Sequence, residues 1–277
     1  MASYQGRPTV ILTGGSAGLG LATLEILLSN NTNVVSLQRT ETPQLASLAQ
    51  KYPGVLVIAK GDVAKDEDNE AAVDVALQVF GRLDALILNA GTVHPVSPIS
   101  SLSLPALREA LDTNFVALVS ILTHALPHLR SREGKAVGEG EPAGRVVLVS
   151  SGASTGGTTG WAAYNATKAA MNSLGRTLGN EEPDIVTVAI RPGTPDTAMQ
   201  ATIREIGAQH MSPSDHARFV NLHKNAELLP PHEPGGVLAG AALRAPREWS
   251  GGFRNWNDEE VKALQLRLEA AEGEEEK

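Results

Sequence analysis

A glycine-rich turn near the start of the chain constrains the fold more than any other stretch. The apolar run Thr9 to Thr13 is followed at once by GGSAGLG, and leucines then recur at helical spacing. Strand, tight turn and helix in this order are typical of the first unit of a parallel α/β sheet. Glycines let the backbone approach a pyrophosphate, and the helix N-terminus attracts its negative charge. The position of the turn favours a dinucleotide site, and the alternative is a simple tight turn.

Further apolar runs alternate with helical patterns along the chain, which predicts an α/β fold. The runs that read as strands are 33–37, 55–59, 83–88, 146–149 and 186–190, with a terminal strand within GGFRNWN. We predict a long helix from Leu104 to Arg130 with a bend at Pro127, and an amphipathic helix from Asp258 to about Ala271. The stretch 131–144 is rich in glycine and charge and reads as a flexible surface loop.

Composition narrows the class of partner to a small molecule. The 277 residues carry a net charge of −8, whereas a nucleic acid or an anionic membrane would favour a basic face. No cysteine is present, which excludes disulfides and thiolate ligands. The most apolar stretch, 117–129, is too short and interrupted to suggest a membrane span. We therefore expect a cytoplasmic protein.

We predict no metal site, because His124 and His128 are separated by Pro127 and lack a nearby acidic ligand.

A second stretch carries groups suited to acid–base chemistry. Ser150 and Ser151 follow the strand at 146–149, and after a glycine-rich loop Tyr164 and Lys168 stand one helical turn apart. A cation within about 4 to 6 Å lowers the pKa of a phenol by roughly 1 to 3 units, so Tyr164 is a candidate general acid. The alternative is an ordinary tyrosine–lysine pair on a helix surface.

With the glycine turn, this stretch resembles the active-site segment of the short-chain dehydrogenase/reductase family. The family places a serine thirteen positions before the tyrosine of its YxxxK motif, which selects Ser151, and an asparagine in a distorted helix, which matches Asn114. The resemblance therefore implies the catalytic set Ser151, Asn114, Tyr164 and Lys168. It also implies one doubly wound Rossmann-type domain at 1–258 with a mostly parallel sheet of about seven strands. A substrate-covering segment is expected at 198–234, and a C-terminal helix and acidic tail at 259–277.

The resemblance implies a nicotinamide cofactor, and the end of the second strand favours NADPH over NADH. A free ribose 2′-hydroxyl usually meets a carboxylate here, but Gln38 supplies none, and Arg39 can bind a 2′-phosphate. The alternatives are a solvated Arg39 and a helix-capping role for Asp62. The expected cofactor contacts are Gly14, Ser16, Gly18, Leu19, Gly20, Arg39, Asp62, Val63, Asn89, Ala90, Gly91, Tyr164, Lys168, Pro192, Gly193, Thr194 and Thr197.

A narrower resemblance connects the chain to fungal benzil reductases and sepiapterin reductases, through SSGAS, GWAAYNATKAAMN, PDTAMQATIRE and SGGFRNWND. Sepiapterin reductases hold the pterin with an aspartate near the last segment, where Asn255 stands here, so an aromatic or vicinal diketone is favoured over a pterin. A sepiapterin or other pterin carbonyl reductase, a sugar or polyol dehydrogenase, and a non-catalytic NADPH-binding regulator are the alternatives.

The resemblance implies that Ser151 and Tyr164 hold the substrate oxygen and that Tyr164 donates the proton. Trp161, Met199 and the terminal segment 253–256 are expected to enclose the substrate, the alternative being that they only close the core. A homodimer or homotetramer is expected, formed through the helix that contains Asn114 and the helix that follows Tyr164.

Overall fold

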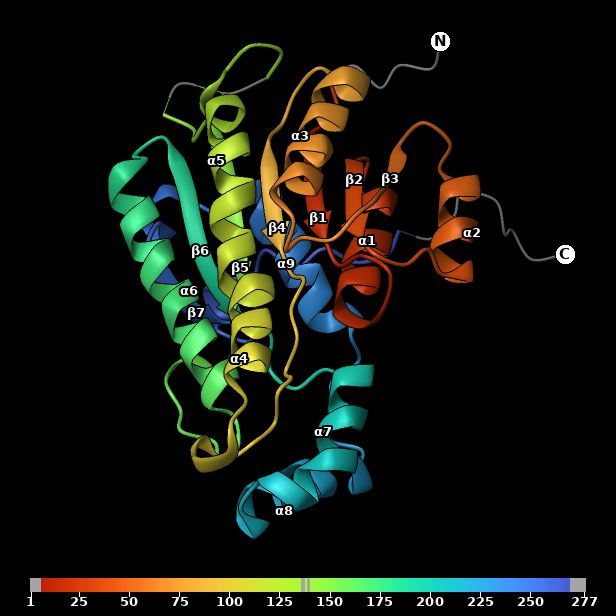
Figure 1. Cartoon of the computed structure of the whole chain (residues 1–277). Coiled ribbons are helices and arrows are strands. Elements are labelled where there is room, and N and C mark those ends of the chain that lie inside the picture. The colour runs from red at the N-terminus through yellow and green to blue at the C-terminus, as the bar shows by residue number, and fades with distance from the viewer. Residues whose placement is uncertain (1–5, 136–137, 139, 270–277) are drawn as a thin grey trace, which may run out of the picture.

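A seven-stranded parallel sheet forms the centre of the computed structural model, which describes residues 6–135, 138 and 140–269 (Figure 1). The strands lie in the order β3-β2-β1-β4-β5-β6-β7, and every neighbouring pair is parallel. The strands up to β3 are added on one side of β1, and the strands from β4 onward are added on the other side, so the strand order switches between β1 and β4. Open α/β sheets bind ligands at such a switch point. The strands are β1 (Thr9–Thr13), β2 (Asn33–Gln38), β3 (Leu56–Lys60), β4 (Ala85–Leu88), β5 (Gly144–Val149), β6 (Ile185–Arg191) and β7 (Gly252–Asn255).

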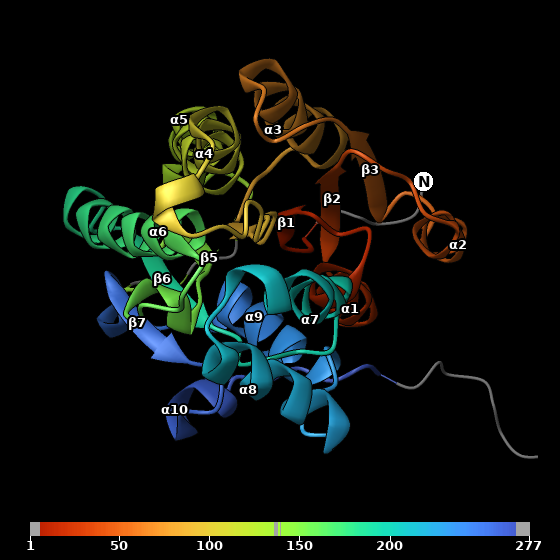
Figure 2. The ribbon, with the colours of Figure 1, turned by 60° about the horizontal axis from the view of Figure 1, so that its bottom comes forward.

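Helices cover both faces of the sheet, as the doubly wound fold requires (Figures 1 and 2). One apolar core joins the sheet to α1 and α9, and a second joins it to α3, α5 and α6. The central strands β1, β4 and β5 are almost wholly buried, so their continuous apolar runs are explained by burial on two faces, whereas the edge strands β3 and β7 are only partly buried. The helices are α1 (Gly18–Ser29), α2 (Pro43–Lys51), α3 (Asp66–Phe80), α4 (Leu104–Leu111), α5 (Ala117–Arg130), α6 (Ala162–Glu181), α7 (Ala198–His210), α8 (Pro213–Lys224), α9 (His232–Arg244) and α10 (Glu259–Lys262).

The predicted fold class and sheet are confirmed, and the differences lie at strand ends. β4 begins two residues later than predicted. Leu83 is buried as expected, but the carboxylate of Asp84 accepts a hydrogen bond of 2.7 Å from the Thr9 N–H, so the ladder starts at Ala85. Such a side-chain bond is invisible to hydrophobic periodicity, which therefore misplaced the boundary.

The long helix predicted from Leu104 to Arg130 is continuous but irregular. A π-helical segment, Asp112–Val116, separates α4 from α5, so the irregularity lies around Asn114, whereas α5 runs through Pro127. By length and composition these 27 residues could cross a membrane, contrary to the sequence expectation. In this fold, however, the buried residues of α5 pack against α3 and the sheet.

The C-terminal segment forms one short helix where the sequence predicted a long one. After α10, residues 263–269 cross α9 without helical structure as far as the structure describes them, while Ala270 and Ala271 lie outside the described residues. The Leu266 N–H donates to the Gly236 carbonyl at 3.0 Å, and Asn30 Nδ2 donates to the Arg267 carbonyl at 2.8 Å. These long-range hydrogen bonds take the place of the intrahelical hydrogen bonds that the amphipathic pattern predicted.

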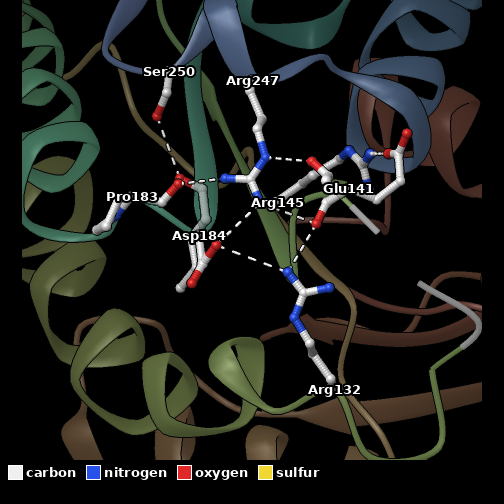
Figure 3. Close-up of polar contacts among 9 residues, drawn as sticks. Arg132, Glu141, Arg145, Pro183, Asp184, Arg247 and Ser250 are labelled. Carbon is white, nitrogen blue, oxygen red and sulfur yellow. Dashed lines mark hydrogen bonds and ion pairs between the residues drawn. The ribbon is translucent and has the colours of Figure 1, made fainter. Parts of the chain in front are cut away.

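The loop 131–144 is more tightly held at its described ends than the flexible surface loop that its composition predicted (Figure 3). Arg132 and Arg247 both donate to the Glu141 carbonyl, at 2.9 and 3.0 Å, and Arg247 also pairs with Asp184 at 3.0 Å. Lys135 Nζ donates to three carbonyls, at 2.9, 3.0 and 3.2 Å. The cluster therefore fastens the loop at the amino ends of β5 and β6, away from the carboxyl ends where the ligand cleft lies.

Helices α7 and α8 lie beyond the carboxyl ends of the strands, where Figure 2 shows them in front of the sheet. A third apolar cluster forms there, joining Ile203 of α7, Phe219 of α8 and Trp161. The carboxylate of Asp215 accepts from the Thr159 N–H at 3.0 Å, which ties α8 to the loop before α6. This arrangement encloses one end of the cleft described next.

Candidate active site

A cleft of about 1090 Å³ lies at the carboxyl ends of β1 to β6. It extends from the glycine turn after β1, past the end of β4, to the cluster formed by α7 and α8. All the predicted cofactor residues line it, together with Ser151, Trp161 and Met199. Asn114 is fully buried behind the cleft wall and does not line it. The tertiary structure thus brings together residues that lie up to 205 positions apart, from Gly14 to Phe219.

The glycine turn is shaped for close approach of the backbone. Gly14 and Gly18 have positive φ angles, +74° and +54°, which side chains other than glycine rarely adopt. A Cβ on Gly20 would lie 2.0 Å from the Gly14 carbonyl oxygen, so any side chain there would break the turn. Asn89 Nδ2 donates to the carbonyls of Thr13 and Gly14, at 3.0 and 3.1 Å. Asn89 therefore braces the turn as well as lining the cleft.

Thr13 is a positioning residue that sequence reasoning did not single out. Its hydroxyl accepts hydrogen bonds from the N–H groups of Asn89 and Ala90, both at 3.0 Å. One threonine at the end of β1 thereby sets the path of the chain after β4. Its place directly before the first glycine was the available signal, but its partners lie more than 70 residues away.

The end of β2 presents a cation and an amide to the cleft. Arg39 is exposed and lines the cleft, and it forms no ion pair with any residue that the structure describes. Gln38 is buried, and its Oε1 accepts from the Ser36 hydroxyl at 2.5 Å. Gln38 Nε2 is buried without a partner among the described residues. The site thus offers two donors and no carboxylate.

Asp62 lies at the end of β3 beside Val63 in the cleft wall. Its Oδ1 accepts from the Ala64 N–H at 3.1 Å, and its own N–H donates to Asp68 Oδ2 at 2.7 Å. The residue that caps α3 is Lys65, so the helix-capping alternative for Asp62 is wrong. Its carboxylate instead closes a turn that brings Asp62 to the cleft.

Ser151 and Tyr164 lie together in the cleft, where the Ser151 hydroxyl acts on the pKa of Tyr164. The Ser151 hydroxyl also accepts from the Ala153 N–H at 3.1 Å, which orients it at the start of a 3₁₀ turn, Gly152–Ser154. Burial raises the pKa of Tyr164 above its ordinary value, and the hydrogen bond with Ser151 opposes this rise only in part. The expectation that Lys168 lowers this pKa is therefore wrong for the side chains as they lie here, because desolvation is the larger effect.

Lys168 is buried one turn after Tyr164. Its Nζ lies 5.7 Å from the centroid of the Tyr164 ring and donates to the Val149 carbonyl at 2.6 Å. Burial lowers the pKa of Lys168 from 10.5 to about 8, because no carboxylate compensates for the lost hydration. The ordinary-surface alternative for this pair is wrong, since Tyr164 is only 8% and Lys168 only 4% exposed.

Asn114 occupies the π-helical segment and binds groups on both sides of it. Its Oδ1 accepts from the Thr92 N–H and its Nδ2 donates to the Thr92 carbonyl, both at 2.8 Å. Nδ2 also donates to the Thr167 hydroxyl at 3.2 Å, next to Lys168. The helix distortion thus joins the chain after β4 to α6. Thr92 and Thr167 are further residues that sequence reasoning missed.

The turn after β6 packs directly on the glycine turn. Gly193 has a φ of +75°, and a Cβ there would lie 2.7 Å from Trp256 Nε1. A Cβ on Gly18 would lie 3.0 Å from the Thr197 methyl group. Trp256 of the terminal segment therefore packs against the turn at Gly193. The segment does not line the cleft, so the expectation that 253–256 encloses the substrate is wrong.

An aromatic wall closes the far end of the cleft. Trp161 is stacked on Phe219, with ring centroids 5.2 Å apart, and meets Tyr164 edge to face at 5.4 Å. Met199 packs against the same cluster. Trp161 thus lines the cleft and packs in the third apolar cluster at once, and its contact with a substrate stays a prediction. Phe219 was missed as a lining residue because it lies 58 positions from Trp161.

Comparisons with known proteins agree with this geometry. The profile of the short chain dehydrogenase family matches residues 8–206. The chain is 38% identical over 248 residues to an oxidoreductase of Schizosaccharomyces pombe, which covers 89% of this chain and 95% of the relative. It is 34% identical over 267 residues to a benzil reductase ((S)-benzoin forming) of Saccharomyces cerevisiae, covering 92% and 98%. The crystal structure of a short-chain dehydrogenase/reductase from Saccharomyces cerevisiae has a TM-score of 0.87 and 32% identity, and the match covers 93% of this chain and 99% of the other.

Proposed function

The chain belongs to the short-chain dehydrogenase family, and within this family of oxidoreductases we propose that it is an NADPH-dependent carbonyl reductase that acts on an aromatic or vicinal diketone. The observation that carries the proposal is that Ser151 and Tyr164 lie in the same cleft as the glycine turn. Lys168 follows the pair one helical turn later. An acid, a second hydroxyl and a dinucleotide-shaped turn in one cleft suit carbonyl reduction.

The residues present fit a dinucleotide. The missing side chains of Gly14, Gly18 and Gly20 leave the backbone N–H groups of the turn and the start of α1 open to a pyrophosphate. Gln38 Nε2 is an orphaned donor and Arg39 an unpaired cation at the place where a ribose phosphate would lie. Both side chains can donate hydrogen bonds to a 2′-phosphate, which supports NADPH over NADH as the cofactor.

When bound, NADPH supplies the hydride, and the chain supplies the proton. The Ser151 and Tyr164 hydroxyls donate hydrogen bonds to the substrate oxygen, and Tyr164 then gives its proton to that oxygen. A raised pKa keeps Tyr164 protonated at neutral pH, which is the form that a proton donor needs. Lys168, with a pKa of about 8, changes protonation in the working range and suits the return of a proton to Tyr164. Asn114 holds the chain segments around Lys168 in place.

Two observations favour a flat, apolar substrate. The wall formed by Trp161, Phe219 and Met199 offers stacking and adaptable packing, and it offers few hydrogen bonds to a polyhydroxylated sugar. Asn255 and Asp258 bond to each other and do not line the cleft, so no carboxylate stands ready for a pterin at this position. The similarity to a benzil reductase supports the same substrate class.

Cofactor choice provides the first prediction. Arg39→Ala should raise the Kd for NADPH roughly tenfold or more and leave that for NADH nearly unchanged, because a charged hydrogen bond contributes about 1.5 to 3 kcal/mol. Titration of both nucleotides against the wild type and the variant, followed by cofactor fluorescence, checks this. Lys60→Ala, a lysine at the end of the neighbouring strand that lies outside the cleft lining, is the control. Equal affinity of the wild type for both nucleotides would contradict the assignment.

Substrate class is tested by NADPH oxidation against a panel of diketones, quinones, pterins and sugars. We expect the highest kcat/KM for an aromatic diketone. A sugar as the best substrate would favour a dehydrogenase working in the oxidative direction, and no turnover with any member would favour a non-catalytic NADPH-binding regulator. A homodimer or homotetramer and a cytoplasmic location stay predictions.

A further inference from the structure

Arg191 lines the cleft but has no part in the chemistry described above. It is the last residue of β6 and directly precedes Pro192 and Gly193. It is half-buried, unlike the fully buried residues before it on the strand. At this point β6 lies beside the end of β5, where the Ser150 N–H donates to the Ile190 carbonyl at 2.8 Å. The Arg191 side chain therefore starts next to the segment that carries Ser151.

The guanidinium of Arg191 lies against Gly152. A Cβ added to Gly152 would meet Arg191 Cζ at 2.9 Å, Nε at 3.0 Å and Nη2 at 3.1 Å. Gly152 directly follows Ser151, so a cation stands one residue from the hydroxyl that we assign to the substrate oxygen. The φ angle of Gly152 is not in the positive range, so its missing side chain matters here only for space, and a methyl group would displace the Arg191 guanidinium.

The charge of Arg191 has no partner among the described residues. No carboxylate lies within 4.0 Å of its guanidinium there, whereas Arg254 on the neighbouring strand pairs with Glu260 at 2.6 Å. A half-buried cation loses part of its hydration and gains from an acceptor that enters the cleft. A guanidinium presents its N–H groups in a fixed plane, which suits an sp² oxygen.

From this geometry we propose that Arg191 determines substrate specificity by donating to a second carbonyl oxygen next to the one that is reduced. The inference deepens the proposed function and rests on it. Ser151 and Tyr164 hold the oxygen of the reacting carbonyl, and Arg191 holds the oxygen on the adjacent carbon. A vicinal diketone has both oxygens, and a simple ketone has only one. The apolar wall at Trp161 and Phe219 favours a neutral diketone with a ring over a charged 2-oxo acid.

A matched pair of substrates tests this role. Benzil has two adjacent carbonyls, and deoxybenzoin replaces one of them with a methylene group. Arg191→Met keeps the alkyl chain over Gly152 and removes the donor. We expect it to lower kcat/KM for benzil roughly 10- to 100-fold, the range for a charged hydrogen bond, and to change that for deoxybenzoin by less than about threefold. If deoxybenzoin turns over too slowly, its inhibition constant against benzil takes the place of kcat/KM.

Three further variants separate recognition from structural damage. Arg191→Lys should restore part of the preference for benzil, because it restores a donor. Gly152→Ala should reduce this preference, because its methyl group displaces the guanidinium. Arg218→Met removes a different arginine of the cleft wall, which is exposed on α8, and the ratio of the two efficiencies should stay as in the wild type.

The outcomes distinguish the inference from the function on which it rests. A wild type that reduces benzil, with Arg191→Met impairing both substrates by the same factor, overturns the role of Arg191 and leaves carbonyl reduction standing. A wild type that reduces neither substrate nor any other carbonyl compound with NADPH overturns both.

Discussion

At the scale of single residues, burial decides the protonation of Tyr164. Replacing Tyr164 by phenylalanine removes only the hydroxyl and keeps the ring that meets Trp161 edge to face. We expect kcat to fall by about 10² to 10⁴, as is typical for loss of a general acid, while the Kd for NADPH changes little. Steady-state kinetics and cofactor titration on the same preparation measure both. Near-normal turnover of Tyr164→Phe would mean that another group donates the proton.

The buried amine of Lys168 makes the free energy of unfolding depend on pH. Its pKa is about 8 in the folded protein and 10.5 in the unfolded chain, so below pH 8 both states bind the proton and the fold bears the cost of burying the charge. Between pH 8 and 10.5 the unfolded state binds more protons, so stability rises with pH. The difference corresponds to on the order of 3 kcal/mol in total, of which about 2 kcal/mol is regained by pH 9.5.

Lys168→Met should remove this part of the pH dependence. Urea unfolding at pH 7 and pH 9.5 should show the wild type gaining about 2 kcal/mol relative to the variant as pH rises. Lys135 has a similar pKa of about 8, but it is present in both proteins, so its effect cancels. Parallel pH dependences for the two proteins would show that Lys168 is not buried as a cation.

At the scale of elements, α9 shows how glycine spacing admits a neighbouring segment. A Cβ on Gly240 would lie 1.8 Å from the Leu264 carbonyl oxygen, and one on Gly236 would lie 2.1 Å from that of Leu266. Both obstacles are backbone atoms, so they cannot move aside as a side chain would. The segment 263–269 therefore lies where it does because α9 has no side chains at these two positions.

Gly240→Ala should destabilise the protein by about 1 to 3 kcal/mol in spite of the better helix propensity of alanine. Gly235→Ala in the same helix is the control, because its nearest atom is 3.2 Å away and the loss should be much smaller. Chemical unfolding of the three proteins supplies the comparison. A more stable Gly240→Ala would mean that the C-terminal segment does not hold this position in solution.

At the scale of the whole molecule, the outer surface of α5 is the most apparent place for self-association. Val116, the last residue of the π-helical segment, is 49% exposed and Val119 of α5 is 42% exposed, which supports the expectation that the helix containing Asn114 meets a second copy. On α6, Leu178 belongs to the core and is not available for such a contact. Ala169 remains exposed and Ala170 partly so.

Val119→Glu should therefore shift the protein toward monomers, since it places a charge in an apolar contact. Light scattering after size exclusion at micromolar concentration measures the mass. Leu268→Glu is the matched control, because Leu268 is 49% exposed on the C-terminal segment, away from α5, and should leave the mass unchanged. A monomeric wild type under these conditions would contradict the predicted oligomer.

Much of the fold was readable because its signals are local. Buried parallel strands require continuous apolar runs, and a positive φ angle favours glycine, so β1, the turn at Gly14 and the start of α1 follow from adjacent residues. The spacing of Ser151, Tyr164 and Lys168 is also local, as all three lie between the end of β5 and the first turns of α6. The strand order and the place of the cleft then follow from the handedness and short connections of such folds.

The sequence by itself determined the α/β class, the glycine turn and the catalytic spacing, because these depend on backbone conformation and burial over a few residues. Only the tertiary structure decided that Arg191 lies against Gly152 and that Phe219 stacks on Trp161. It also decided that the C-terminal segment crosses α9 without helical structure. It also reversed the expected direction of the Tyr164 pKa shift. The physical reason is common to all four. Desolvation and close contact depend on which distant side chains share a space, and no local pattern records that.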